Sequence, residues 1–511
     1  MSAADRRGIA QRGAGRGRLR WPDARHGVAV GALGLAVAAV GSAALGLLGA
    51  SSATSSPVLA VGAAFVDVTP LWLKTLATST FGTADKAALA VGMVVVLAGV
   101  FAGVGVLART RRTAAVVALV GLAGVALAAV LTRAGATVVD TVPTLAGGLV
   151  SLVALRREDG ASAAGPTRRE VVTLAGSAVA LGVFTPISGR RAAFDRADVR
   201  LPESGPPPPA VDANVDIPGV PSWVVPNGDF YRIDTALVVP RVSAADWSLR
   251  VWGEVEREVT LTWAELLAKP LVRRYTTLAC VSNEVGGHLV GNAEWTGWPV
   301  RELLASAGPR PGADMVLSRS VDGWTAGTPL DVLTDGRDAL LAVGMNGDPL
   351  PVEHGFPVRL VVPGLYGYVS ATKWVVELKV TRFAVDQGYW TPRGWAAFGP
   401  VKTASRIDVP RSGAQVATGT VAVAGVAWAM HRGVTGVQVR VDGGPWADAR
   451  LAGEPTIDSW RQWVYSWTAT PGSHVLTVRA RDATGQWQTA EVARPDPDGA
   501  TGLHSVTVRV G

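Results

Sequence analysis

The stretch TTLACVSNEVGGHLVGNAEWTGWPVRELL, at residues 276–304, contains Cys280, the only cysteine in the 511-residue chain. A single cysteine cannot form an internal disulfide, and it cannot supply a zinc site that needs several Cys and His ligands. Three interpretations remain open at this point. Cys280 is an inert buried residue, a nucleophile, or one thiolate ligand to a metal that another group also holds.

The composition divides the chain into two unlike parts. Charged residues make up 17% of the sequence and the mean hydropathy is +0.27, which is too apolar for an ordinary soluble protein. Residues 27–188 consist mainly of Ala, Val, Leu and Gly, whereas every tryptophan except Trp21 and Trp72 follows residue 220. We therefore expect a membrane region followed by a soluble globule. No nucleic-acid-binding motif is present, so nucleic acid is not an expected partner.

Hydropathy and charge together predict the membrane topology. The segment 57–80 is interrupted by charged residues and by proline, and we interpret it as a surface or re-entrant segment. With five spans, the basic clusters at 109–112 and 156–159 lie in the cytoplasm together with the N-terminus, as the positive-inside rule requires. The prediction is a multi-pass protein of the cell membrane whose globule is extracytoplasmic. The five apolar runs long enough to span a bilayer are 28–50, 87–108, 113–132, 136–155 and 171–188.

Two further sequence features concern export and redox cofactors. Arg168 and Arg169 precede the last apolar run and resemble a twin-arginine export signal; two ordinary flanking charges are the alternative. None of the six histidines lies within the apolar runs, and no CxxCH motif occurs. We therefore expect no haem and no iron–sulfur cluster in this chain.

The pattern of residues predicts three regions joined by a linker. Region 1–190 is the membrane region, with about five transmembrane helices. Residues 191–219 are proline-rich and predict an extended linker. Residues 220–385 mix short alternating stretches with short helical ones, which is typical of an α+β domain. Residues 400–511 repeat short alternating segments between Gly, Asp and Pro turns, which predicts a β-sandwich.

Several sequence blocks resemble one enzyme family. After Cys280 come WTGWPVRELL at 295–304, SRSVDGWTAGTPL at 318–330 and LLAVGMNGDPLPVEHGFPVRLVVPGLYGYVSATKWV at 340–375. Their order and spacing are similar to those of the sulfite oxidase family of molybdopterin-dependent oxidoreductases. The resemblance implies a molybdenum–molybdopterin cofactor, one protein cysteine on the metal, and an immunoglobulin-like domain through which two chains form a homodimer.

The resemblance also implies the roles of individual residues. Cys280 is the expected metal ligand, and Cys280 and Arg232 are the expected catalytic residues. A guanidinium and an ammonium group suit the phosphate of the pterin. The positions expected to bind the cofactor are Asn227, Tyr231, Arg232, Cys280, Ser320, His354, Arg359, Ser370, Thr372 and Lys373.

Two positions depart from the pattern of the sulfite-oxidising members, which carry an arginine soon after the cysteine and a tyrosine just before MNG. Here CVSNEV offers Glu284 and Val285, and LLAVGMNG offers Val343. A sulfite anion needs cationic partners, so we expect a neutral sulfoxide or N-oxide as the substrate. Oxidation of sulfite is the alternative.

A second alternative is a membrane receptor or interaction protein that has kept the fold without the cofactor. If the chain is an enzyme, oxygen-atom transfer moves two electrons and the sequence offers no second redox centre. The expected partners are therefore a small-molecule substrate, the lipid bilayer, and a separate haem protein or quinone-linked electron carrier.

Overall fold

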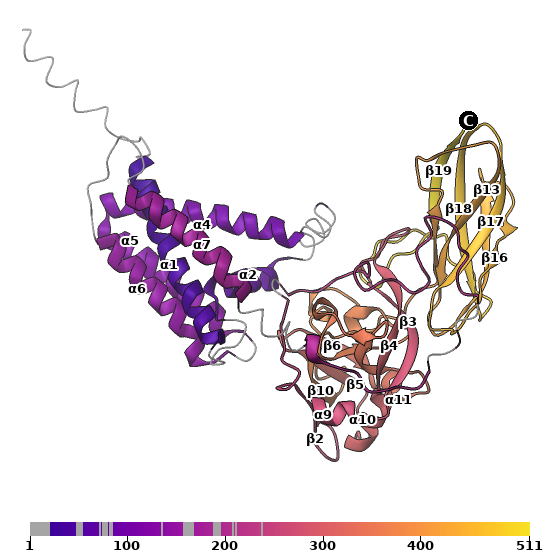
Figure 1. Cartoon of the computed structure of the whole chain (residues 1–511), viewed down its shortest axis with the longest axis horizontal. Helices are drawn as coiled ribbons and strands as arrows, with labels where there is room; N and C mark the ends of the chain where they lie inside the picture. Colours follow the sequence, from indigo (N-terminus) through magenta and orange to yellow (C-terminus); the bar gives the residue numbers. More distant parts are fainter. Residues whose placement is uncertain are drawn as a thin grey trace, which may run out of the picture. The chain divides into compact units, whose positions relative to one another are not determined.

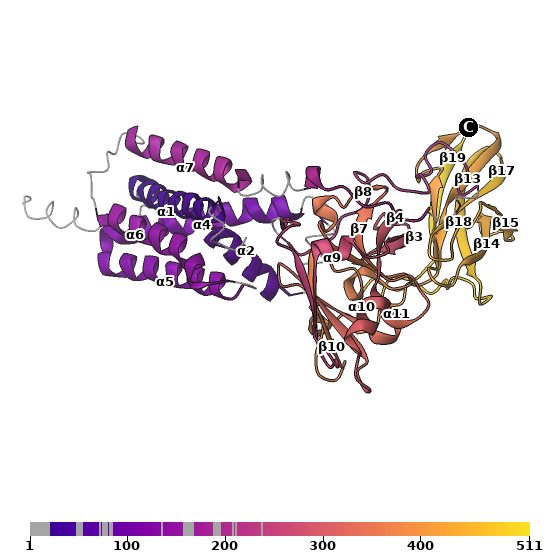
Figure 2. The same cartoon turned by 60° about the horizontal axis from the view of Figure 1, so that its bottom comes forward.

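The computed structural model describes residues 21–47, 55–70, 73, 80, 85–133, 136–156, 168–187, 196–206, 209, 212–236 and 239–511. The chain divides into two compact units, residues 1–190 and 191–511. The first contains helices and the second is dominated by strands (Figures 1 and 2).

The first unit is a helical bundle in which α1 contacts α4, α6 and α7. Gly34 of α1 lies against Gly147 of α6, so closely that a Cβ on either residue would overlap the facing helix. Small residues at such contacts allow apolar helices to pack backbone to backbone. The helices are α1 (Trp21–Leu47), α2 (Pro57–Val68), α4 (Asp85–Thr110), α5 (Arg112–Leu131), α6 (Val142–Arg156) and α7 (Arg168–Ile187), with a 3-10 turn, η2, at Val138–Thr141.

Within the described residues, four helical segments are long and apolar enough to cross a membrane, judged by length and composition. They are Asp23–Gly46, Ala88–Thr110, Arg112–Leu131 and Val138–Arg156. These match four of the five predicted spans. At the fifth, the apolar helical stretch is Val171–Ala180, which is shorter than the 171–188 run expected from the sequence.

Helix α2 covers only part of the segment 57–80. It has 12 residues, so it is about 18 Å long, whereas a bilayer core is about 30 Å thick. Asp67 at its end forms an ion pair of 2.8 Å with Arg133, which follows α5. Most of residues 71–84 lie outside the described residues, so the re-entrant assignment remains a prediction.

The second unit contains a central domain built on two sheets. One sheet has the order β2-β1-β10-β5-β6, and the other has the order β3-β4-β7-β8 with β9 paired to β7. Short helices connect the strands, as expected for an α+β domain. The strands are β1 (Ser248–Gly253), β2 (Val259–Thr262), β3 (Val272–Ala279), β4 (Val290–Pro299), β5 (Met315–Ser320), β6 (Thr325–Pro329), β7 (Leu340–Met345), β8 (Asp348–Pro349), β9 (Arg359–Val361) and β10 (Val375–Thr381); the helices are α9 (Trp263–Leu267), α10 (Val300–Ala307) and α11 (Leu330–Thr334), and the 3-10 turns are η3 (Val352–His354), η4 (Gly367–Val369) and η5 (Thr391–Arg393).

The antiparallel pair β3–β4 positions the cysteine. Ala279, the last residue of β3, pairs with Val290, the first residue of β4, so residues 280–289 form the connection between the two strands. All ten residues of β4 are buried, which places this hairpin inside the domain. A strand covered on both faces loses the alternation that a half-exposed strand would display.

The C-terminal part of the second unit contains two further sheets, of order β11-β13-β17-β16 and β12-β19-β18-β14-β15. Side chains from both sheets, such as Trp463 and Val478, form one apolar core between them. In both views the strands run side by side as an elongated group (Figures 1 and 2). The strands are β11 (Ala404–Val409), β12 (Gln415–Val416), β13 (Gly419–Trp428), β14 (Val434–Val441), β15 (Ala447–Asp448), β16 (Arg450–Leu451), β17 (Arg461–Ala469), β18 (Gly472–Asp482) and β19 (Ser505–Val510).

The end of the stretch predicted as a linker is bound to the C-terminal domain. The Val215 amide donates to Oε1 of Gln462 at 2.8 Å, and Nε2 of Gln462 donates to the Pro221 carbonyl at 2.8 Å. Just after it, the indoles of Trp223 and Trp460 each donate to the other's backbone carbonyl, at 3.0 and 2.9 Å. Residues 215–223 are therefore part of the folded globule and do not act as a free spacer.

Candidate functional site

Cys280 lies at the start of the β3–β4 connection and is buried. Its amide donates to the Leu289 carbonyl at 2.9 Å, and its carbonyl accepts from the Asn283 amide at 3.1 Å. Burial raises the pKa of the Cys280 thiol, although hydrogen bonds from Ser282 act in the opposite direction. The free side chain is therefore a protonated thiol near neutral pH, and a metal would have to displace that proton.

The segment PNGDFYR brings Asn227 and Tyr231 into the domain interior. Oδ1 of Asn227 accepts from Nδ2 of Asn346 at 2.8 Å, and the Tyr231 ring stacks on Phe230 with centroids 5.2 Å apart. Burial raises the pKa of the Tyr231 phenol; Cys280, in its thiolate form, raises that pKa further, whereas the positive charge of Arg359 lowers it. The Tyr231 hydroxyl thus lies within electrostatic range of both the cysteine and the arginine.

His354 and Arg359 form a buried pair that connects to Asn227. Nε2 of His354 lies 3.1 Å from the Asn227 carbonyl, and Nη1 of Arg359 donates to the His354 carbonyl at 3.1 Å. Burial, together with the charge of Arg359, lowers the pKa of His354 to about 4. The imidazole is therefore neutral near pH 7, and its bond to Asn227 requires the proton on Nε2. Nδ1 is left as an acceptor, so this side chain cannot donate to an anion.

Arg359 is 5% exposed, and its Cζ atom lies 5.0 Å from the centroid of the Trp295 ring. Among the described residues no carboxylate pairs with it. Burial lowers its pKa to about 10, so Arg359 is still a cation near neutral pH. A buried, unpaired cation is costly unless an anion joins it, and this is the main indication of an anionic ligand here.

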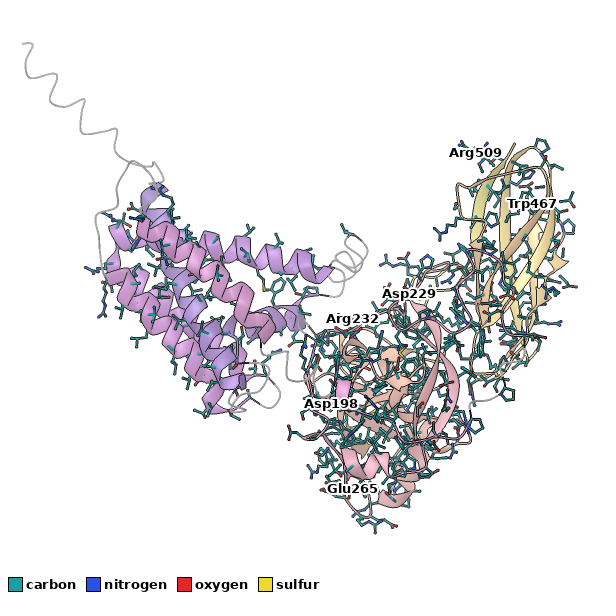
Figure 3. All side chains as sticks on the ribbon, in the orientation of Figure 1. Asp198, Asp229, Arg232, Glu265, Trp467 and Arg509 are labelled. Carbon is teal, nitrogen blue, oxygen red and sulfur yellow. The ribbon has the colours of Figure 1, made fainter. Side chains whose placement is uncertain are left out.

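Lys373 and Arg232 share one carboxylate. Nζ of Lys373 lies 2.6 Å from Oδ2 of Asp234, and Nε of Arg232 lies 2.9 Å from the same oxygen. Lys373 also donates to the Glu353 carbonyl at 3.0 Å. Burial lowers the pKa of Lys373 to about 8, although Asp234 acts in the opposite direction. Arg232 lies at one end of the central domain, whereas Glu265 of α9 lies at the opposite end (Figure 3).

The three predicted hydroxyl groups are buried, and each is engaged within the protein. The Ser370 hydroxyl donates to the Tyr366 carbonyl at 2.9 Å, and the Thr372 hydroxyl shares a 2.7 Å hydrogen bond with that of Ser318. Ser320 ends β5, and its hydroxyl accepts from the Asp322 amide at 3.5 Å. Ser370 and Thr372 therefore use their hydroxyl groups to fix the local backbone and side chains near Lys373 and are not free donors.

Hydrogen bonds and ion pairs thus connect five of the ten predicted residues into two groups. Asn227, His354 and Arg359 are connected by hydrogen bonds, and Tyr231 lies in electrostatic range of Arg359 and Cys280. Lys373 and Arg232 meet at Asp234. Within the part of the chain that the structure describes, no group of three or more His, Cys, Asp and Glu residues is placed to hold a metal. A metal at Cys280 would therefore need most of its ligands from a cofactor.

Sequence reasoning missed three residues of this site. Asp234 is the carboxylate between the two cations, and an acid two positions after Arg232 was the available signal. Trp295 lies under Arg359, and no pattern in WTGWPV indicated it. Tyr366 is buried, its hydroxyl accepts from the Lys402 amide at 3.5 Å, and burial, with a further contribution from Cys280, raises its pKa to about 12. The position of Tyr366 in a Gly-rich turn of the sequence did not indicate that Cys280 would affect its pKa.

The central domain is similar to known proteins. Residues 236–390 match the family model described as the oxidoreductase molybdopterin binding domain. The uncharacterized oxidoreductase YuiH of Bacillus subtilis is 33% identical over 149 residues, which cover 29% of this chain and 72% of that protein.

Two vertebrate proteins are also similar. Sulfite oxidase of Gallus gallus is 29% identical over 322 residues, covering 53% of this chain and 69% of that protein. Mitochondrial sulfite oxidase of Mus musculus is 31% identical over 288 residues, covering 47% of this chain and 52% of that protein. This chain therefore spans about two thirds of the first and about half of the second.

Proposed function

Because the chain belongs to the sulfite oxidase family of molybdopterin-dependent oxidoreductases, we propose that it transfers an oxygen atom to or from a small molecule at a molybdenum bound by Cys280. It is a molybdenum-dependent oxidoreductase on the evidence of that family. The observation that carries the proposal is the buried cation Arg359, which has no carboxylate partner among the described residues. Arg359 and Cys280 both affect the pKa of Tyr231. When bound, the molybdenum–molybdopterin group supplies two-electron oxygen-atom transfer.

The residues present fit a cofactor that carries a phosphate. Arg359 and Lys373 both offer N–H donors to phosphate oxygens, and Arg359 lacks an anionic partner in the described chain. His354, as a neutral imidazole, positions the Arg359 guanidinium through its backbone carbonyl and does not act as a second cation. Cys280 supplies one sulfur once its thiol loses the proton that burial favours.

For the substrate we favour a neutral sulfoxide or N-oxide. Glu284 and Val285 are exposed on the connection that begins with Cys280, and Val343 is fully buried in β7. The predicted catalytic cation Arg232 is paired with Asp234, which reduces the positive charge available to an anionic substrate. Oxidation of sulfite is the second candidate, and the names of the chicken and mouse relatives favour it.

A dye-linked assay of the purified full chain distinguishes these substrates. We expect turnover with sulfoxides or N-oxides and a reduced dye, and little turnover with sulfite and an oxidised dye. Robust sulfite oxidation would show that Glu284 and Val285 do not exclude the anion.

The remaining alternative is a receptor that keeps this fold without a cofactor. After expression in a cofactor-competent host, molybdenum analysis should give about one atom per chain, as expected for one metal site. The Cys280→Ser variant should be inactive. Absence of molybdenum from the wild type would favour the receptor.

We propose that the N-terminal helices anchor the enzyme in the cell membrane and that the globule is extracytoplasmic. The four long apolar helices support the anchoring, and the basic clusters support the direction. Reporter fusions after residues 110 and 158 should be active in the cytoplasm, and a fusion after residue 200 should be active outside. An external reporter at residue 110 contradicts the five-span topology. Replacement of Arg168 and Arg169 with lysine tests the export signal.

We also propose an external electron carrier, a haem protein or a quinone-linked partner, because the chain provides no second redox centre in its sequence. The C-terminal two-sheet domain is the candidate for an immunoglobulin-like dimerisation module. The purified chain should lack haem absorption, and light scattering of the detergent-solubilised protein measures its oligomeric state.

A further inference from the structure

The connection between β3 and β4, residues 280–289, is here called the Cys280 loop. It contains its own hydrogen bonds: Oδ1 of Asn283 accepts from the Leu289 amide at 2.8 Å, and the Gly287 amide donates to the Glu284 carbonyl at 2.9 Å. These bonds close the loop on itself. They do not fix where the loop lies relative to the rest of the domain.

Arg406 of β11, in the C-terminal domain, binds the Cys280 loop directly. Its Nη1 donates to the Gly287 carbonyl at 2.7 Å. Arg406 is buried, and its Nε donates to Oδ1 of Asp408 at 2.7 Å, an ion pair in which both side chains are at most 7% exposed. Because Asp408 holds one side of the guanidinium, the other side is directed at the loop.

His504, just before β19, contacts the same loop from a second direction. Its Nδ1 accepts from the Ile407 amide at 3.0 Å, so the neutral ring carries its proton on Nε2. The Nε2 and Cδ2 edge faces Gly286, where an added Cβ would overlap the ring and where the backbone has a positive φ of +79°. The imidazole therefore fills the space that Gly286 leaves open.

The strand that leads to the cysteine is also held by the C-terminal domain. The amide of Thr277, three residues before Cys280, donates to the Asp458 carbonyl at 2.9 Å. The Thr277 hydroxyl accepts from the Trp460 amide at 2.8 Å and donates to Oδ1 of Asn292 at 3.0 Å. Residues on both sides of Cys280 are thus fixed from outside the central domain.

From these contacts we propose that His504 and Arg406 are positioning residues for Cys280. They hold the Cys280 loop in the conformation that presents the sulfur to the metal, before any cofactor is bound. The C-terminal domain is then a structural part of the metal site in addition to any role in dimerisation. This inference rests on the proposed ligand role of Cys280, and it follows the general rule that residues behind a metal ligand set its orientation.

The single cysteine makes the test direct, because every thiol signal comes from Cys280. The full chain is produced in a host that does not make the pterin, and the rate of alkylation by iodoacetamide is measured at constant pH. Alkylation of a buried thiol requires local opening of the loop. We expect His504→Ala to raise this rate by about tenfold or more, and Arg406→Lys, which keeps the charge beside Asp408, to raise it by a smaller factor.

His474 provides a matched control in the same domain. Its side chain is bound to Asp442 and to the Thr470 carbonyl, and among the described residues it forms no hydrogen bond or ion pair with the Cys280 loop. His474→Ala should keep the wild-type alkylation rate to within about twofold. His504→Asn is the control for misfolding. Its amide oxygen still accepts from the Ile407 amide, whereas the ring contact with Gly286 is lost. It should also alkylate faster than the wild type.

A wild-type alkylation rate in both His504 variants overturns this inference, even if Cys280→Ser is inactive. In a cofactor-competent host, the same variants should contain less molybdenum per chain than His474→Ala does. If Cys280→Ser keeps full activity, the proposed function fails instead, and the alkylation result still reports whether His504 holds the loop.

Discussion

The Nζ of Lys373 lies 2.6 Å from Oδ2 of Asp234, although the two residues are 139 positions apart in the sequence. The same carboxylate also pairs with Arg232, so one negative charge faces two positive ones. Together with Arg359, this part of the central domain keeps an excess of positive charge. Electrostatics therefore favours an anionic group, and the phosphate of a pterin cofactor is of the expected kind.

The first prediction concerns pH and Lys373. Burial lowers its pKa to about 8, so the ammonium loses its charge as the pH rises through 8. The affinity of the cofactor-free chain for inorganic pyrophosphate should then fall by up to about tenfold per pH unit above 8. Lys373→Arg should keep the affinity to higher pH because its guanidinium stays protonated. Titration calorimetry between pH 7 and 9.5 measures both proteins.

The stability of the cofactor-free protein depends on pH in the opposite direction to its pyrophosphate affinity. The unfolded chain keeps this lysine protonated up to its ordinary pKa of 10.5, whereas the folded chain releases the proton near 8. The unfolded state therefore binds more protons in that window, and the cofactor-free protein should become more stable as the pH rises from 8 to 10.5. A pyrophosphate affinity that does not change between pH 7 and 9.5 would contradict the assignment of Lys373.

The second prediction separates binding from stability at Arg359. Arg359→Met removes a buried cation that has no carboxylate partner in the described chain, so the cofactor-free protein should lose no more than about 1 kcal/mol of its free energy of unfolding. Cofactor content after expression in a competent host should fall to background. Arg250→Met, at an exposed arginine paired with Glu258, is the control and should keep both properties. A large loss of stability in Arg359→Met would indicate a structural role.

The third prediction concerns the stability of the cofactor-free protein at acidic pH. The pKa of His354 falls from 6.5 to about 4 on folding, so the unfolded chain binds more protons between these values. The free energy of unfolding should therefore decrease as the pH falls from 6.5 to 4, by up to roughly 3 kcal/mol from this residue. His354→Gln, which does not titrate, should have a flatter profile than the wild type in urea titrations of the cofactor-free chain. Identical slopes would show that His354 is not buried as a neutral ring.

The fourth prediction concerns Trp223 and Trp460, whose indoles donate to each other's carbonyls. Trp460→Phe removes the hydrogen bond to the Trp223 carbonyl and leaves a buried cavity beside that carbonyl. We expect a loss of about 2–4 kcal/mol in the free energy of unfolding, measured by calorimetry. Trp446→Phe keeps an aromatic face for Arg479, which lies 4.2 Å from the Trp446 centroid, and should cost much less. Equal losses of stability in Trp460→Phe and Trp446→Phe would show that the reciprocal hydrogen bonds between Trp223 and Trp460 add no particular stability.

The sequence alone was sufficient for the features that depend on local pattern. Apolar runs predict helices because the backbone must satisfy its own hydrogen bonds in a bilayer, and four of the five runs are long apolar helices. Alternating residues at 400–511 predict strands because successive side chains point to opposite faces. The motif blocks around Cys280 and HGFPVR were sufficient to identify the family.

Only the tertiary structure decided which residues meet. Asp234 between Lys373 and Arg232, Trp295 under Arg359, and His504 against Gly286 join segments that are distant in the chain, and no local periodicity encodes such pairs. The ten buried residues of β4 have no alternation to read because both faces are covered. The physical reason is the same in each case: burial and charge pairing depend on which elements the fold brings together, whereas a sequence pattern reports only on the element that contains it.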